Sequence, residues 1–127
     1  MATAITSTVG ANAADNNAYE SKGRKTVSQV YAATSIPLFA KGAVLQVFNY
    51  AQLTGAMTIN AATTIANLTQ WDEVVFIFEA DGTERIVTFG TSFLSSGTVT
   101  IPIDLGATVR GIFDGTNIRI YAREIYA

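Results

Sequence analysis

The side chains that could carry out acid–base chemistry in this sequence are carboxylates, and two groups of them stand close together. Asp72 and Glu73 are adjacent, so on a strand they would point to opposite faces and could not act as a pair. Glu79, Asp81 and Glu84 cluster around a predicted turn. A glycosidase-like pair needs carboxyl groups about 5 to 9.5 Å apart. The sequence does not fix the distances between these carboxyl groups, but a solvated acidic turn is the simpler explanation of the cluster. We therefore expect no catalytic residue and no enzyme activity.

Other reactive and metal-binding residue types are missing from the sequence. It contains neither cysteine nor histidine, which removes thiol nucleophiles, histidine-based triads and the usual zinc sites. Asp104 and Asp114 do not stand in the D-x-D-x-D-G spacing of a calcium loop. Gly90, Gly97 and Gly106 fit no phosphate-binding fingerprint. We expect neither a metal site nor a cofactor.

The residues with the clearest potential for binding lie near the N-terminus. Residues 1–35 show no regular apolar period but carry a basic cluster. We predict an extended arm that becomes ordered against a partner. The basic residues of the arm would dock onto an acidic neighbouring subunit, which would also bury the apolar residues of the arm. The alternative is that the segment is a solvated loop. The predicted partner-binding residues are Lys22, Arg24, Lys25, Val27, Val30 and Tyr31.

The composition predicts one domain that buries part of its surface against partners. Its 127 residues are 49% hydrophobic and only 14% charged, whereas soluble domains usually contain about 25% charged residues. Exposed apolar area on a small protein often marks an interaction site. The alternative is a monomer whose alanines and threonines raise the mean hydropathy to +0.29. The net charge of −2 argues against nucleic-acid binding. Polar residues interrupt the uncharged stretch between Lys41 and Asp72, so we expect no membrane span.

Residues 36–127 alternate short β-prone runs with turns, which predicts an all-β domain. Between residues 72 and 80 both faces of a predicted strand are apolar. We predict a hairpin closed by Ala80-Asp81-Gly82, with Gly82 in the left-handed region, and a second hairpin closed by residues 114–117. The predicted fold is an antiparallel β-sandwich or jelly roll of about seven to eight strands. A β-helix is the alternative, because Thr-Ile pairs recur, although at uneven spacing.

Residues 58–126 also carry short motifs in a fixed order. They are Thr58-Ile59-Asn60, Asp72, Asp81-Gly82-Thr83, Arg85, Thr88-Phe89-Gly90-Thr91, Phe93, Thr100-Ile101-Pro102 and the strand Ile118 to Tyr121. In this order they resemble a small β-module of tailed-bacteriophage virions, found in head decoration or head-fibre proteins and in tail-fibre proteins. Two features depart from that family. Trp71 stands where the family often has glycine, and the last strand lacks the tryptophan that is common there.

The resemblance implies a structural role in a virion, without catalysis. Because 127 residues leave no room for a long fibre shaft, we expect a capsid decoration (cement) protein on the capsid surface. It would be a homo-oligomer, with a trimer favoured, and would bind the major capsid protein or neighbouring virion subunits. The alternative is a tail-fibre tip or tail accessory protein that binds a host-surface receptor. In that case Tyr50, Trp71 and Tyr121 are the candidates for glycan recognition.

Overall fold

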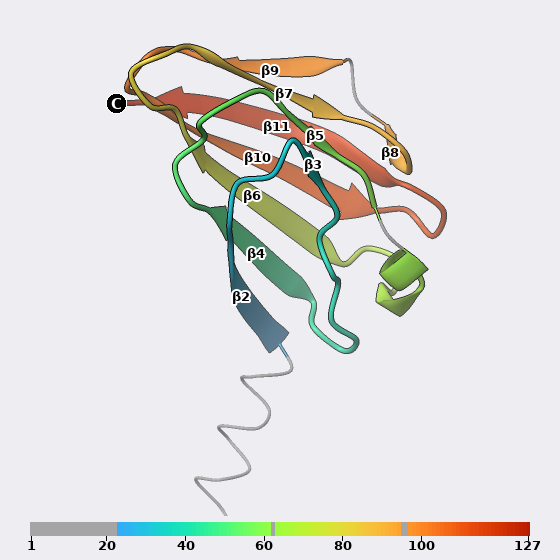
Figure 1. The fold of residues 1–127 in the computed structure, drawn as a ribbon. Helices are drawn as coiled ribbons and strands as arrows, with labels where there is room; N and C mark the ends of the chain where they lie inside the picture. Colours follow the sequence, from blue (N-terminus) through green and yellow to red (C-terminus); the bar gives the residue numbers. More distant parts are fainter. Residues whose placement is uncertain (1–22, 62, 95–96) are drawn as a thin grey trace, which may run out of the picture.

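Ten short strands and one 3-10 helix make up the secondary structure of the computed structural model, which describes residues 23–61, 63–94 and 97–127. The 3-10 helix η1 lies at the end of the sheets where β6 begins (Figure 1). The elements are β2 (Arg24–Gln29), β3 (Thr34–Ser35), β4 (Leu45–Tyr50), β5 (Met57–Ile59), η1 (Thr63–Asn67), β6 (Glu73–Glu79), β7 (Arg85–Phe89), β8 (Phe93–Leu94), β9 (Thr98–Ile101), β10 (Gly106–Phe113) and β11 (Ile118–Tyr126).

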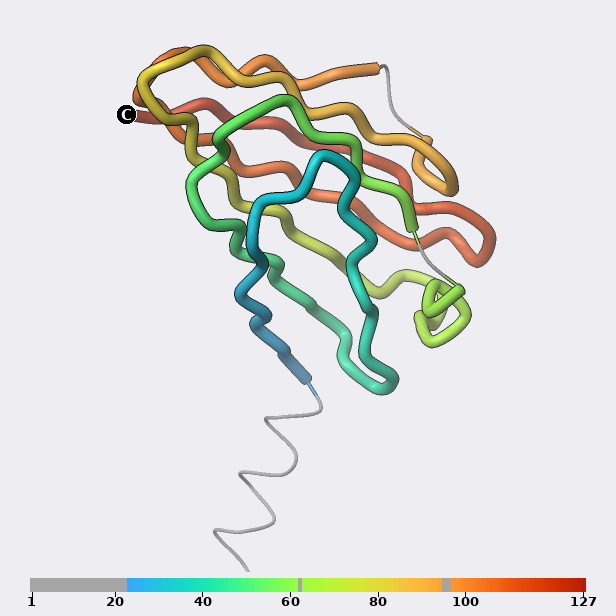
Figure 2. The backbone as a smooth tube through the Cα atoms, in the orientation of Figure 1, coloured from blue at the N-terminus to red at the C-terminus, as the bar shows by residue number. Residues whose placement is uncertain are grey.

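The strands form two sheets, and the chain passes from one sheet to the other as it winds. One sheet has the order β2-β4-β6-β10-β11-β8 and the other has the order β3-β5-β7-β9. From β2 to β7 successive strands alternate between the sheets, and the neighbours within each sheet run parallel. This part of the chain is a short β-solenoid of three coils, β2–β3, β4–β5 and β6–β7, whose winding can be followed in Figure 2.

The expected all-β fold with two sheets is therefore confirmed, but the pairing differs from that of an antiparallel jelly roll. Of the eight strand pairings among the described residues, five are parallel and three are antiparallel. The winding of the first three coils corresponds to the β-helix alternative. The physical reason is that these turns carry the chain from one sheet to the other, and parallel neighbours require such crossovers.

The predicted hairpin at Ala80-Asp81-Gly82 is wrong for this reason. Strands β6 and β7 lie in different sheets and do not pair. Ala80 is fully buried, and its N–H donates to the carbonyl oxygen of Leu105, so the chain bends into the core at this point. Gly82 is not among the glycines with positive φ, and a Cβ there would meet no atom within 4 Å. The corner requires no left-handed residue at that position.

The second predicted hairpin is confirmed. Strands β10 and β11 pair antiparallel from Gly106↔Tyr126 to Phe113↔Ile118, with an irregularity between Arg110 and Gly111. The turn between them places Gly115 at a φ of 102°, a left-handed conformation that glycine adopts without steric cost.

The predicted boundary between an arm and a β-domain at residue 35 is also corrected. Strand β2 pairs with β4 over Arg24–Gln29, and β3 pairs with β5. These two strands form the first coil, so residues 24–35 belong to the folded domain. Residues 1–22 lie outside the described part of the chain.

The core lies between the two sheets and is rich in aromatic side chains. Phe48, Phe76 and Phe78 point inward from the six-stranded sheet, and Phe89 points inward from the other. The ring centroids of Phe76 and Phe89 are 5.5 Å apart, a distance at which aromatic rings attract each other in tilted geometry. Gln46 is fully buried, and its side-chain amide exchanges hydrogen bonds with the N–H and C=O of Ala40. This holds the loop before β4 against the core.

Candidate functional site

The acidic cluster at the β6–β7 corner is part of the scaffold. The Asp81 carboxylate accepts two hydrogen bonds from Arg85, each 2.8 Å long, and a third from the N–H of Thr83. The hydrogen bond from the guanidinium lowers the pKa of Asp81, which keeps it ionised. Glu79 and Glu84 are exposed on either side of the corner. With Asp81 held by Arg85, this corner stabilises the crossing between the sheets.

The motifs around Asn60 and Gly90 also have a structural role. The side-chain oxygen of Asn60 accepts a hydrogen bond of 2.9 Å from the N–H of Thr91. The Gly90 N–H donates to the carbonyl oxygen of Ile59, at 2.8 Å. A Cβ at Gly90 would collide with the Asn60 amide. The two motifs are therefore complementary halves of one contact between β5 and β7.

Two further carboxylates hold turns in place. Asp72 is buried, and its Oδ2 accepts a hydrogen bond from the N–H of Thr69. Asp114 accepts hydrogen bonds from the N–H groups of Asn117 and Thr116, and an ion pair at 2.6 Å from Arg119. These contacts, the one with Asn117 first, lower the pKa of Asp114 to about 2. Both acids act as acceptors for their own loops.

The described residues contain no cluster suited to a metal ion. Across residues 23–61, 63–94 and 97–127 no three acidic side chains come together to hold one. In the same residues no helix is long and apolar enough to span a membrane.

The structure places the predicted partner-binding residues in two environments. Val27 and Tyr31 are half-buried and pack against the core of their own chain. The Tyr31 hydroxyl donates to the carbonyl oxygen of Ala56, at 2.9 Å. By contrast, Arg24, Lys25 and Val30 are exposed. Lys22 lies outside the described residues.

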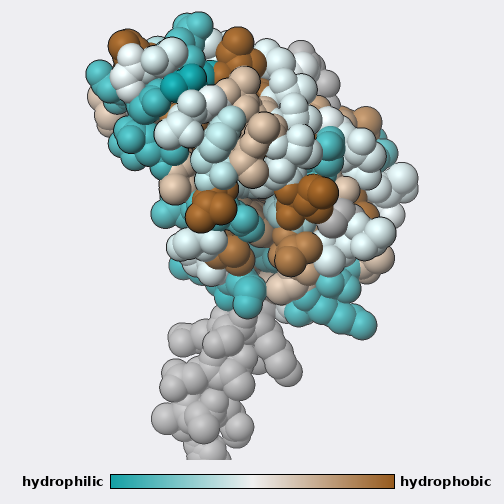
Figure 3. Space-filling model, viewed as in Figure 1, coloured by the Kyte–Doolittle hydropathy of each residue, from teal (hydrophilic) through white to brown (hydrophobic). Residues whose placement is uncertain are grey.

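The first coil carries a surface that the sequence analysis identified only in part. Val30 is 76% exposed, Ile36 is 53% exposed and Leu38 is 65% exposed. Together with Arg24 and Lys25, these three residues are called the first-coil surface below. Figure 3 shows hydrophobic side chains gathered over β2, β3 and the segment that leads to β4. The sequence analysis missed Ile36 and Leu38 because the residues between and after them, Pro37 and Phe39, are also apolar. The alternation of buried and exposed side chains along this segment is therefore visible only in the structure.

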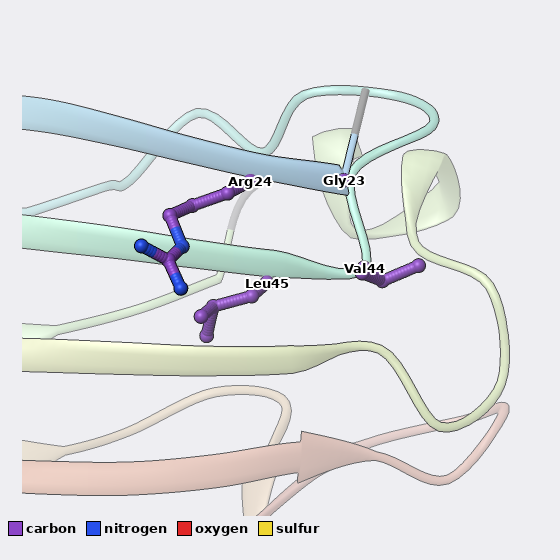
Figure 4. Close-up of a pocket in the computed structure, with 4 residues that line it drawn as sticks. All are labelled: Gly23, Arg24, Val44 and Leu45. Atoms are coloured by element: carbon purple, nitrogen blue, oxygen red, sulfur yellow. The ribbon is translucent and has the colours of Figure 1, made fainter. Parts of the chain in front are cut away.

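The first coil also ends both sheets on one side. Among the described residues, no strand pairs with the outer side of β2 or of β3. Beside the start of β2 lies a hollow of about 600 Å³ lined by Gly23, Arg24, Val44 and Leu45. In Figure 4 the side chains of Arg24 and Leu45 lie along the sheet, whereas Val44 points away from it beyond the strand ends. A partner could therefore meet unpaired backbone, apolar side chains and a guanidinium group together.

The three aromatic candidates for glycan recognition differ in how far their side chains are exposed. Tyr50 is buried, and burial raises the pKa of its hydroxyl, which shares a hydrogen bond of 2.9 Å with Ser35. Tyr50 is therefore a core residue, and the prediction of a binding role for it is wrong. Trp71 and Tyr121 are 62% and 55% exposed. The Tyr121 hydroxyl donates to Glu73, and this hydrogen bond raises the pKa of Tyr121.

No protein-family model matches the chain, and no curated protein matches it.

Proposed function

We propose that this protein is a structural component of a tailed-bacteriophage virion, a decoration (cement) protein that binds and stabilises the assembled head shell. It would lie on the capsid surface, contact the major capsid protein or neighbouring virion subunits, and assemble as a homo-oligomer, with a trimer favoured. The bacteriophage assignment rests on the motif order between Thr58 and Tyr126. The motif residues whose side-chain contacts were described above hold turns and corners in place, and this supports a scaffold without catalysis.

The observation that carries the binding role is the first-coil surface. Three large apolar side chains are exposed within nine residues, on the coil that also carries the exposed Arg24 and Lys25. Among the described residues, the outer edges of its two strands are unpaired. Such an edge is a template for pairing with another chain, and exposed apolar patches mark protein-binding sites. Solenoids are generally capped at their ends by polar repeats. Within the described residues the first coil carries an apolar surface and no polar repeat covers it, so we propose that a neighbouring subunit does.

A tail-fibre tip or tail accessory protein that binds a host-surface receptor is the second candidate function. The exposed side chains of Trp71 and Tyr121 favour it. The two functions differ in where the protein is bound in the particle and in how many copies are present.

The test compares two variants of exposed aliphatic residues. Leu38→Asp changes the first-coil surface. Ile103→Asp changes a residue that is 55% exposed in the turn between β9 and β10. Each purified protein is mixed with heads that lack it, and the pelleted heads are analysed for bound protein and for the temperature at which they break open. We expect wild type and Ile103→Asp to bind and to raise that temperature, because a ligand of the assembled state stabilises it.

We expect Leu38→Asp to remain folded, to stay in the supernatant and to leave the heads unprotected. If Leu38→Asp decorates and protects the heads as well as wild type does, the first coil is not the attachment surface.

A further inference from the structure

A strained and exposed tryptophan stands out on the surface of the protein. Trp71 has a φ of 77°, in the left-handed region that bulky residues seldom adopt. Its side chain is 62% exposed, so packing within the chain does not offset this strain. Strain of this kind persists where the surrounding structure imposes it, and it is concentrated at functional sites.

The backbone conformation at Trp71 is fixed by main-chain contacts and does not depend on the indole side chain. The Trp71 N–H donates to the carbonyl oxygen of Phe113 at 2.6 Å, and the Asp72 N–H donates to that of Thr69 at 2.9 Å. The buried carboxylate of Asp72 closes the same turn by accepting from Thr69. Glycine would satisfy this geometry without strain. The large aromatic side chain therefore requires an explanation outside the fold.

Polar side chains are held in place next to this turn. Glu73, two residues after Trp71, accepts a hydrogen bond from the Tyr121 hydroxyl, and its carboxylate lies 4.0 Å from the guanidinium of Arg110. The three side chains are on the outward face of the six-stranded sheet, because Val74 and Val109 beside them point into the core. Their positions are set by mutual contacts before any ligand arrives.

We propose that Trp71, with Glu73, Arg110 and Tyr121, forms a binding site for a saccharide. A sugar ring presents a face of C–H groups and a rim of hydroxyls. An exposed indole can stack on that face, and the nearby polar cluster supplies a carboxylate that accepts hydrogen bonds and a guanidinium that donates them. Aromatic anchors of protein interfaces lie instead at the centre of desolvated, well-packed patches, whereas the two side chains that contact Glu73, Arg110 and Tyr121, are polar and open to water.

The site adjoins the first-coil surface, because Arg24 pairs with Leu45 and Leu45 pairs with Glu73 in neighbouring strands. It uses different residues, so it adds a second activity to the proposed function. Only the expectation that the saccharide belongs to a bacterial surface rests on the bacteriophage assignment. The decoration assay with Leu38→Asp and the saccharide assay below can fail independently of each other.

The experiment uses the fluorescence of Trp71, which is the sole tryptophan in the sequence. The full chain is first screened on an array of bacterial O-antigen and capsular polysaccharides and of neutral hexose oligomers. An oligosaccharide that binds is then titrated into the protein. We expect the emission to shift to shorter wavelength and iodide quenching to fall, because stacking removes the indole from water.

Trp71→Gly and Ser92→Gly form a matched pair of variants. Both place glycine at a residue with positive φ, since Ser92 has a φ of 71°. Both should therefore fold with an unchanged or higher melting temperature. We expect Trp71→Gly to weaken binding on the array roughly tenfold or more and Ser92→Gly to leave it unchanged. A conservative Trp71→Phe variant should retain part of the affinity.

Three results would overturn the proposal: no binding to any saccharide on the array, equal binding by wild type and Trp71→Gly, or protection of the indole from quenching only by capsid protein. The last result would assign Trp71 to a protein interface.

Discussion

The contact between Asn60 and Gly90 provides a direct test of the scaffold role of the motifs that contain these two residues. Gly90 leaves the space that the Asn60 amide occupies, and that amide accepts the N–H of Thr91. We expect Asn60→Ala and Gly90→Ala each to destabilise the protein. Because both disrupt the same contact, the double variant should be more stable than the sum of the two effects predicts.

The magnitudes follow from the contact itself. Asn60→Ala removes one hydrogen bond, with a cost of about 1 kcal/mol. Gly90→Ala displaces the Asn60 side chain, which loses the same bond and forces an unfavourable rotamer at a further cost of about 0.5–1.5 kcal/mol. When the Asn60→Ala substitution is already present, the new methyl group at position 90 meets no closer atom than one at 3.5 Å. There Gly90→Ala should be neutral, or stabilising by about 0.4–1 kcal/mol, because it restricts the unfolded chain. The restriction of the unfolded chain acts in both backgrounds and cancels, so the coupling energy is about 1.5–2.5 kcal/mol.

Urea denaturation of the four proteins measures this coupling, provided that the slopes with denaturant agree. Each 1 kcal/mol should also shift the melting temperature by roughly 3–5 °C in a chain of this length. If the two substitutions add within about 0.5 kcal/mol, the complementarity of the two motifs is refuted.

Two further predictions concern turns. Gly82→Ala should leave the melting temperature unchanged or raise it, whereas Gly42→Ala should lower it, at a cost of about 1 kcal/mol of stability. The reason is that of these two glycines only Gly42 has a positive φ, and neither has a close neighbour. Equal melting temperatures of the two variants would show that the two turns were misassigned. Asp114→Asn should lower the melting temperature at pH 6, and the difference in melting temperature from wild type should disappear between about pH 4 and pH 2. A carboxylate with a depressed pKa stabilises the fold above its ordinary pKa, and this stabilisation is lost as the pH falls through about 2. A gap that is the same at pH 6 and pH 2 would contradict the contribution of the ionised carboxylate.

The positions of the later strands could be predicted from the sequence, but the way they connect could not. Apolar runs and turn residues locate β4, β6 and the β10–β11 hairpin, because alternation and turn chemistry are local signals. Whether a turn closes a hairpin or crosses between sheets depends on contacts far along the chain. At the β6–β7 corner the burial of Ala80 against Leu105 decides this. A loop that reads Ala-Asp-Gly in sequence is compatible with both outcomes.

The first coil was missed for a related reason. Residues 24–35 contain little apolar periodicity, and β2 becomes a strand through its pairing with β4. Tyr31 packs where Gly55 leaves room for its ring, a complementarity that no local pattern shows. For the candidate sites, the exposed basic residues and Trp71 could be selected from the sequence. The strain at Trp71 and the alignment of Glu73 with Tyr121 required the structure, because they depend on the register of β6, β10 and β11.

The most direct test of the proposed function is the number of copies of this chain in purified virions of the phage proposed to encode it, measured by quantitative mass spectrometry relative to the major capsid protein. A symmetric shell repeats each binding site many times, so a decoration protein should be present in a fixed ratio to the major capsid protein, at hundreds of copies per particle. A handful of copies that fractionate with the tail, or none, would contradict a cement role.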